Sequence, residues 1–243
     1  MTKIFSFILL LTPLVLSAQR LKVVRIDHPE QSYHEKYQVL ASDDSTRQGL
    51  YEKTYKKHKV MERGYYKNGE KDSLWAKFCL YENFILSQGY YVNGTKSGVW
   101  TVYKNKDTID LKYDFTANKL LYFEPDTLKK YAVLVGRDTI YTKLLQPPLY
   151  LDGIADINSL LCSNLHYPDA ARENNIQGCV HIGFIIYPDG HAGAPWIMES
   201  VHQSIDDEAL RVAHKISGKW LPGILDGKAV TSFFDLPVVF KLE

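Results

Sequence analysis

The stretch that decides the fold lies near the C-terminal end and begins NLHYPDAARENNIQGCVHIGFIIYPDG at Asn164. Within residues 179–187 every second residue is apolar, which predicts a strand with one buried face. Residues 205–216, IDDEALRVAHKI, carry apolar residues at helical spacing, which predicts an amphipathic helix. A last apolar run over 229–240 predicts another strand. Together with a short strand around Trp196, this order predicts an α+β unit whose helices pack on a three-stranded sheet.

The helix predicted over residues 205–216 has a start signal. Ser204 stands directly before it, and a serine there can cap the free N–H groups of the first turn. Asp207 follows three residues later, as in a capping box. Asp206 and Glu208 add negative charge near the positive end of the helix dipole. We therefore expect the helix to begin at residue 205 with Ser204 as its cap.

The last predicted strand, 230–240, contains a proline. Pro237 has no N–H to donate, and a proline inside a strand is tolerated mainly at a sheet edge or bulge. The strand is therefore predicted to lie at an edge, where an extended peptide can add itself as a further strand. A loop or a second copy of the chain could equally cover this edge, because open edges invite unwanted pairing. Peptide binding and a homodimer are thus both open at this surface.

This region resembles the C-terminal domain of the TonB energy-transducer family over roughly the last third of the chain. The resemblance rests on short motifs in a fixed order: Tyr167-Pro168, Ala171-Arg172, Ile176-Gln177-Gly178, Asp189-Gly190, Asp207-Glu208-Ala209-Leu210-Arg211, Trp220 with Pro222-Gly223, Gly227-Lys228 and Leu236-Pro237-Val238. In that family the last strand pairs with the N-terminal motif of outer-membrane receptors. The resemblance therefore implies an outer-membrane TonB-dependent receptor, or another envelope protein, as partner. It implies these residues for backbone pairing: Thr231, Ser232, Phe233, Phe234, Asp235 and Leu236.

The sequence also departs from the family. Proline numbers only 10 and is scattered, so there is no long proline-rich spacer. The apolar run at 4–16 is short and lacks the polar histidine that contacts the motor in the family. We therefore do not expect force transmission of the family's kind, whereas peptide binding, accessory to TonB-dependent transport, remains the expectation.

An internal repeat precedes this region. The segments GYYKNGEKDSLWAKF and GYYVNGTKSGVWTVY begin at Gly64 and Gly89, a period of 89 − 64 = 25 residues. Asn68-Gly69 and Asn93-Gly94 are strong signals for tight hairpin turns. Because one hairpin cannot bury its own apolar face, such repeats stack. Residues 19–145 are therefore predicted to form an antiparallel β ladder, and the repeats resemble the MORN-like repeats of bacterial secreted proteins.

The aromatic residues of the repeat allow two interpretations. They can form the core and the cross-strand pairs of the ladder. Alternatively, an exposed aromatic strip could bind glycan, lipid headgroups or protein, which would make the chain a secreted structural scaffold. The candidate residues for this alternative are Tyr65, Tyr66, Trp75, Tyr90, Tyr91 and Trp100.

The remaining boundaries follow from turns and from the N-terminal composition. Residues 120–123, 131–135 and 139–144 are predicted as strands that cap the ladder, and residues 146–148 as a linker to a domain spanning 146–243. Residues 1–18 read as a secretory signal peptide, which predicts a periplasmic protein. The alternative is an inner-membrane anchor formed by residues 4–16, although this run is shorter than a spanning helix needs.

The sequence offers no catalytic motif, so we expect a protein without enzymatic activity, cofactor or metal. The spacing of His181, His191, His202 and His214 matches no familiar ligand set. A formal net charge of +1 gives no electrostatic case for nucleic acid. The cysteines are Cys79, Cys162 and Cys179; a bond between the last two is one option, and small buried thiols are the favoured one.

Overall fold

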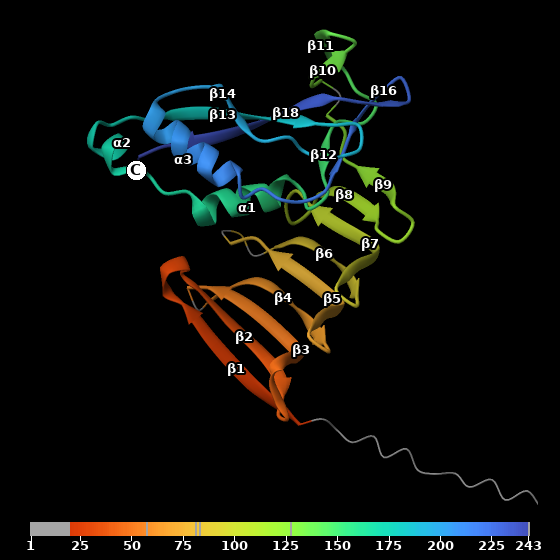
Figure 1. The fold of residues 1–243 in the computed structure, drawn as a ribbon, viewed down its shortest axis with the longest axis vertical. Helices are drawn as coiled ribbons and strands as arrows, with labels where there is room; N and C mark the ends of the chain where they lie inside the picture. Colours follow the sequence, from red (N-terminus) through yellow and green to blue (C-terminus); the bar gives the residue numbers. More distant parts are fainter. Residues whose placement is uncertain (1–19, 57, 81, 83, 127, 243) are drawn as a thin grey trace, which may run out of the picture.

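The computed structural model describes residues 20–56, 58–80, 82, 84–126 and 128–242, so the signal peptide predicted over residues 1–18 lies outside the described residues. The N-terminal half is a nine-stranded antiparallel sheet whose strands pair in chain order, which confirms the predicted ladder (Figure 1). A single 3-10 turn, Pro29–Gln31, joins the first two strands. The strands are β1 (Leu21–His28), β2 (Tyr33–Leu40), β3 (Asp43–Tyr55), β4 (Lys59–Lys67), β5 (Glu70–Phe78), β6 (Ile85–Val92), β7 (Thr95–Tyr103), β8 (Ile109–Asp114) and β9 (Lys119–Phe123).

The two sequence repeats form the hairpins β4–β5 and β6–β7. Asn68 and Gly69 have φ values of 52° and 84°, and Asn93 and Gly94 have 47° and 75°. Positive φ at both central residues is the signature of the tight turn that these dipeptides favour. The turn chemistry thus fixes the register of each hairpin, as the sequence predicts.

The C-terminal half is built on a second sheet with the strand order β11-β10-β18-β13-β14. Its strands are β10 (Tyr131–Val135), β11 (Asp138–Thr142), β13 (Gly178–Ile186), β14 (Trp196–Glu199) and β18 (Ser232–Phe240). Two small strand pairs flank it: β12 (Leu149–Tyr150) with β15 (Trp220–Leu221), and β16 (Gly223–Leu225) with β17 (Lys228–Val230).

The prediction of a three-stranded sheet was therefore two strands short. The hairpin β10–β11 was expected to cap the ladder, but it extends the second sheet instead. Val133 lies opposite Ser232 in the register, and the N–H of Leu134 donates to the carbonyl of Thr231 at 2.9 Å. The side chain of Val133 is fully buried there, so its apolar surface stabilises this placement.

Three helices pack on one face of the second sheet: α1 (Ile154–Asn164), α2 (Asp169–Glu173) and α3 (Gln203–Ala213) (Figure 1). The predicted alternation in β13 is confirmed, because its apolar residues are buried against these helices together with the apolar stripe of α3. This core contains Val180, Ile182, Phe184, Ile186, Ile205, Ala209, Val212, Ala213, Leu236, Val238 and Phe240.

The predicted start of α3 was wrong by two residues. The helix begins at Gln203, and the N-cap is His202, whose Nδ1 accepts from the N–H of Ser204 at 3.2 Å. The buried carboxylate of Asp206 accepts from the hydroxyl of Ser200 and from the N–H of Val201. A histidine cap combined with a carboxylate that reaches back to the preceding loop explains why the Ser204 signal misplaced the boundary.

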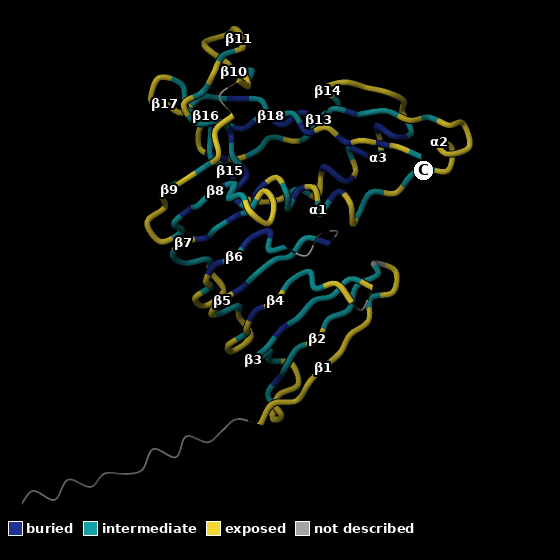
Figure 2. Tube along the Cα trace, turned by 180° about the vertical axis from the view of Figure 1, so that it is seen from behind, coloured by how far each residue is buried: buried dark blue, intermediate teal, exposed yellow. Residues whose placement is uncertain are grey.

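The two halves are in direct contact. Leu151 is buried in one cluster with Val102, Leu111 and Tyr113 of the ladder. Residues 146–148, predicted as a linker, belong to the C-terminal half, since Gln146 bridges to Ile224. Figure 2 shows that buried segments run through the C-terminal half and into the ladder, whereas β1 at the far end is exposed along much of its length.

All three cysteines are free thiols, so the Cys162–Cys179 bond is not formed. The favoured alternative of buried thiols also fails for Cys162, which is exposed on α1, while Cys79 and Cys179 are half-buried. No helix in the described ranges combines the length and the apolar character that crossing a bilayer requires.

Candidate protein-binding edge

The strand β18 has one side fully paired and the other side mostly unpaired. On one side it pairs with β13 along its whole length, from Ser232 opposite Ile186 to Phe240 opposite Gly178. On the other side it meets β10, so β18 lies between two strands and the prediction of an edge strand was wrong in that respect. The pairing with β10 is nevertheless confined to Ser232, because β10 ends near that point. Among the residues that the structure describes, no strand pairs with this side from residue 233 to residue 240. We call this stretch, 233–240, the β18 edge.

The direction of the main-chain groups follows from the contact with β10. The carbonyl of Thr231 points toward β10, and successive residues of a strand direct their N–H and C=O groups to opposite sides. The main-chain groups of Phe233, Asp235 and Val239 therefore point outward along the β18 edge. Pro237 occupies the same outward row, where its missing N–H costs no bond to β13. This placement is the physical reason why a proline is tolerated in this strand.

The six candidate pairing residues thus fall into three groups. Thr231 and Ser232 already contact β10. Phe234 and Leu236 direct their main-chain groups toward β13. Phe233 directs its N–H at β10 beside the Val133–Ser232 pair, so of the six only Asp235 presents both main-chain groups to a partner. The outward Val239 lies beyond the predicted range.

The side chains of β18 alternate between two surfaces. Leu236, Val238 and Phe240 point into the helix-covered core. On the opposite, open face the ring of Phe233 meets Trp196 edge-on, with 6.2 Å between centroids. Val239 is 63% exposed on that face. A strand added to the β18 edge would therefore have the helices on one side and a partly apolar open face on the other.

Three polar side chains, those of Cys179, His181 and Asp235, lie in a row on the open face. Nδ1 of His181 is 2.9 Å from a carboxylate oxygen of Asp235, and Nε2 of His181 is 3.7 Å from Sγ of Cys179. Burial, followed by the nearby charge of Asp235, raises the pKa of the Cys179 thiol. The raised pKa favours the protonated thiol at neutral pH.

Each of the four histidines considered as metal ligands has a different structural contact. His191 contacts Asp189 at 2.6 Å, His202 caps α3 and His181 contacts Asp235. His214 is the C-cap residue of α3. Within the described ranges, no group of three or more histidine, cysteine or acidic side chains is arranged to hold a metal ion.

The aromatic residues of the repeat are divided between two faces of the ladder. Trp75 and Trp100 are buried at 1% and 3% exposure. Tyr66 and Tyr91 meet them edge-on, each at 5.2 Å between centroids. Of the six residues proposed for glycan binding, the exposed ones are Tyr65 and Tyr90, at 50% and 57%. The tryptophans therefore serve the core, and an exposed strip can use only the two tyrosines.

The β18 edge lies in a part of the chain that is similar to one protein family. The family model described as Gram-negative bacterial TonB protein C-terminal matches residues 163–242. The match includes β13, β14, α3 and β18, while the ladder and the β10–β11 hairpin lie outside it. No curated protein and no solved structure matches the chain. The family match indicates a TonB-like role in protein interaction at the cell envelope.

Proposed function

We propose that the chain binds an extended segment of a partner protein, which adds itself as a strand along the β18 edge. The observation that carries the proposal is the outward row of unpaired main-chain groups at Asp235 and Val239, beyond the point where β10 ends its pairing with β18. Main-chain hydrogen bonds of this kind give affinity, and alternate side chains give specificity. The family match over the same strand supports the choice of partner, an outer-membrane TonB-dependent receptor.

The proposed setting is the periplasm, with residues 1–18 acting as a signal peptide. In this setting the chain is accessory to TonB-dependent transport, since it has no proline-rich spacer to carry force across the envelope. The ladder, with its MORN-like sequence repeats, would hold the binding domain in place.

The test measures binding of synthetic peptides from the N-terminal segments of TonB-dependent receptors to the full chain by fluorescence anisotropy. Val239→Pro removes one outward N–H at an exposed position without removing a bond to β13. Losing one hydrogen bond should weaken binding by roughly three- to tenfold. Val239→Thr keeps the N–H and is the matched control. Equal affinity of the two variants, or no binding by the unaltered chain, would refute strand addition.

A second function is favoured by the open face of the ladder. Tyr90 lies directly opposite Leu74 in the register of β5 and β6, and both are exposed, at 57% and 45%. Tyr65 and Val99 continue this exposed apolar strip at 50% and 44%. We propose as the alternative that this strip binds envelope glycan or protein. Sedimentation with purified peptidoglycan should then depend on Tyr65 and Tyr90, and a Tyr65→Ala/Tyr90→Ala variant that sediments unchanged would exclude the strip.

A further inference from the structure

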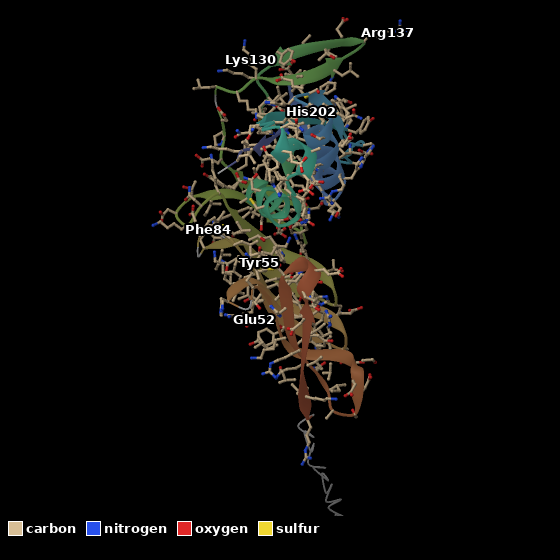
Figure 3. The ribbon with its side chains drawn as sticks, turned by 90° about the vertical axis from the view of Figure 1, so that its left-hand side faces the viewer. Glu52, Tyr55, Phe84, Lys130, Arg137 and His202 are labelled. Atoms are coloured by element: carbon tan, nitrogen blue, oxygen red, sulfur yellow. The ribbon has the colours of Figure 1, made fainter. Side chains whose placement is uncertain are left out.

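The β10–β11 hairpin lies at one end of the molecule, as the outermost part of the second sheet. Figure 3 shows it at the end opposite to β1, with Lys130 and Arg137 at the two ends of the hairpin. β11 is the last strand in the order β11-β10-β18-β13-β14, so no described strand pairs with its outer side. The hairpin precedes residue 163, and the family match does not cover it. Its surface is therefore a feature of this chain rather than of the matched domain.

The hairpin exposes apolar side chains on both of its faces. Among its strand residues only Val133 is buried. The exposed apolar side chains are Leu134, Val135, Ile140 and Tyr141, with exposed fractions of 40%, 45%, 42% and 70%. Neighbouring residues of a strand point to opposite faces, so each strand contributes one of these side chains to each face. Apolar residues on both faces are the pattern of a strand whose surroundings are apolar on both sides.

Three exposed basic side chains flank these apolar residues. Arg137 lies in the turn, and Lys130 and Lys143 come directly beyond the last register pair of the hairpin, Tyr131 with Thr142. Lys130 and Lys143 are therefore like charges at facing positions, an arrangement that costs stability unless an anion lies near. In the part of the chain that the structure describes, no carboxylate forms an ion pair with any of the three.

The charge of the hairpin is not balanced by the acidic residues around it. Residues 130–145 carry three basic side chains and one acidic one, Asp138, which gives a net charge of 3 − 1 = +2. Glu124 and Asp126 precede this segment, but they line a cavity toward α1 and the ladder together with Lys129. The end of the molecule formed by the hairpin is thus basic, and it favours a negatively charged partner.

Basic and apolar side chains in this combination suit the headgroup layer of an anionic membrane. Lysine and arginine approach the lipid phosphates there, and apolar side chains reach the boundary of the acyl chains. A protein that covered one face of the hairpin would leave the apolar residues of the other face in water. A lipid layer into which the outermost strand sinks surrounds both faces, and the unpaired main-chain groups of β11 stay among water and headgroups.

We propose that the β10–β11 hairpin docks the chain on an anionic phospholipid surface. Leu134, Val135, Ile140 and Tyr141 enter the layer below the headgroups, and Lys130, Arg137 and Lys143 contact lipid phosphates. The hairpin also contacts β18, so a docked chain holds the β18 edge near the membrane while the ladder extends away from it (Figure 1). This inference goes beyond strand addition and does not depend on it.

The experiment measures sedimentation of the chain with lipid vesicles. It uses residues 19–243, which include every described residue, so that the apolar run at 4–16 cannot itself bind lipid. The protein should sediment with vesicles of phosphatidylglycerol and stay in solution with vesicles of phosphatidylcholine. Binding to phosphatidylglycerol should weaken as the salt concentration rises, because salt screens the attraction between exposed charges.

A charge variant and its control locate the binding surface. Lys130→Gln/Arg137→Gln/Lys143→Gln should weaken binding to phosphatidylglycerol vesicles by roughly a hundredfold, since each cation near an anionic surface contributes to the attraction. Arg25→Gln/Lys36→Gln/Lys67→Gln removes the same number of charges at exposed positions of the ladder. This control should bind as the unaltered chain does.

An apolar variant tests the second part of the surface. Ile140→Thr/Tyr141→Thr keeps residues that favour strands and should weaken binding by roughly tenfold, because less apolar surface leaves water. Val92→Thr/Val99→Thr is the control at exposed positions of the ladder, and it should change binding little. Circular dichroism confirms the fold of each variant.

Several outcomes would overturn membrane docking. These are no sedimentation with phosphatidylglycerol vesicles, equal sedimentation with phosphatidylcholine vesicles, or a hairpin charge variant that binds as tightly as its ladder control. A dimer in size-exclusion chromatography that Ile140→Thr/Tyr141→Thr dissociates would show a second copy of the chain on the hairpin, and it would overturn docking too. Val239→Pro should sediment with the vesicles as the unaltered chain does, so a failure of strand addition is distinguishable from a failure of docking.

Discussion

The two repeat hairpins share one internal geometry but have different neighbours. In β4–β5 the indole N–H of Trp75 donates to the carbonyl of Tyr65 at 2.9 Å, and in β6–β7 that of Trp100 donates to the carbonyl of Tyr90 at 3.0 Å. The ammonium groups of Lys71 and Lys96 lie 3.9 and 4.4 Å from the centroids of these indole rings. The period of 25 residues thus specifies a three-dimensional unit, and not only a sequence pattern.

The difference lies in the carboxylate that each lysine meets. Lys71 donates to Glu62 of the neighbouring strand at 2.6 Å. The residue one period later is Ser87 (62 + 25 = 87), which is buried and carries no charge. Lys96 therefore has no carboxylate within its repeat at that position, and it donates to Asp152 of the C-terminal half. One substitution in a repeat converts an internal ion pair into a contact between the two halves.

The largest expected effect on stability concerns the buried tryptophan that both repeat hairpins contain. Trp75→Ala and Trp100→Ala should each lower the free energy of unfolding by about 3–5 kcal/mol, because a large buried ring is replaced by a cavity. Leu74→Ala, at a residue 45% exposed, is the control and should change it by less than about 0.5 kcal/mol. Urea unfolding followed by circular dichroism measures all three. A tryptophan variant as stable as the leucine control would contradict the shared core.

The next effect concerns the glycines that face the tryptophans. A Cβ on Gly64 would lie 2.1 Å from the ring of Trp75, and one on Gly89 would lie 2.4 Å from Trp100. Gly64→Ala and Gly89→Ala should therefore each cost about 2–3 kcal/mol through overpacking. Gly193→Ala is the control, since its Cβ would meet its nearest atom at 3.5 Å in ordinary contact. Equal unfolding midpoints for the three variants would mean that the rings move aside freely.

Whether a feature of the fold can be predicted from the sequence depends on how far apart along the chain its interacting residues lie. The hairpins are predictable because Asn-Gly turns and the repeat period act over a few residues. The unpaired stretch of β18 is predictable because Pro237 removes a donor locally, whereas the place of β18 between β10 and β13 is not. The pairing of Val133 with Ser232 joins residues about a hundred positions apart, and no local pattern distinguishes it from capping of the ladder.

The contact between the two halves could not be predicted from local sequence patterns either, although one feature of the repeat pointed to it. Asp152 lies outside the repeat, so periodicity cannot name it as a partner of Lys96. The serine at 87, where the first repeat has Glu62, leaves a lysine without its internal carboxylate. A cation left unmatched in one copy of a repeat is the pattern that could have pointed to a second partner.

A smaller effect tests the contact between the halves. Asp152→Asn leaves Lys96 without its carboxylate, and it should cost about 1–2 kcal/mol at neutral pH because both side chains are roughly four-fifths buried. Burial disfavours the charged form of Asp152, but Lys77 and Lys96 outweigh it and lower its pKa. The stabilisation is therefore present above the unfolded pKa of about 4 and is lost as pH falls through the lower folded value.

The urea midpoints of the unaltered chain and of Asp152→Asn should accordingly differ at neutral pH and converge at about pH 3 or below. Asp226→Asn, at an exposed turn residue, serves as the control at each pH. A difference that stays constant with pH would show that the charge on Asp152 is not what holds the halves together.

The smallest effect compares the two ion pairs directly. Glu62→Ser copies the second repeat's residue into the first, and it should cost about 0.5–1 kcal/mol, since Lys71 and Glu62 are 28% and 21% exposed and partly screened by water. A double-mutant cycle with Lys71→Met isolates the coupling of this pair, and a second cycle with Lys96→Met and Asp152→Asn isolates the other. The second coupling should be the larger, because Asp152 is also held by the charge of Lys77 in a more buried setting. Equal couplings would mean that the exchange of Glu62 for Ser87 between the repeats carries no energetic consequence.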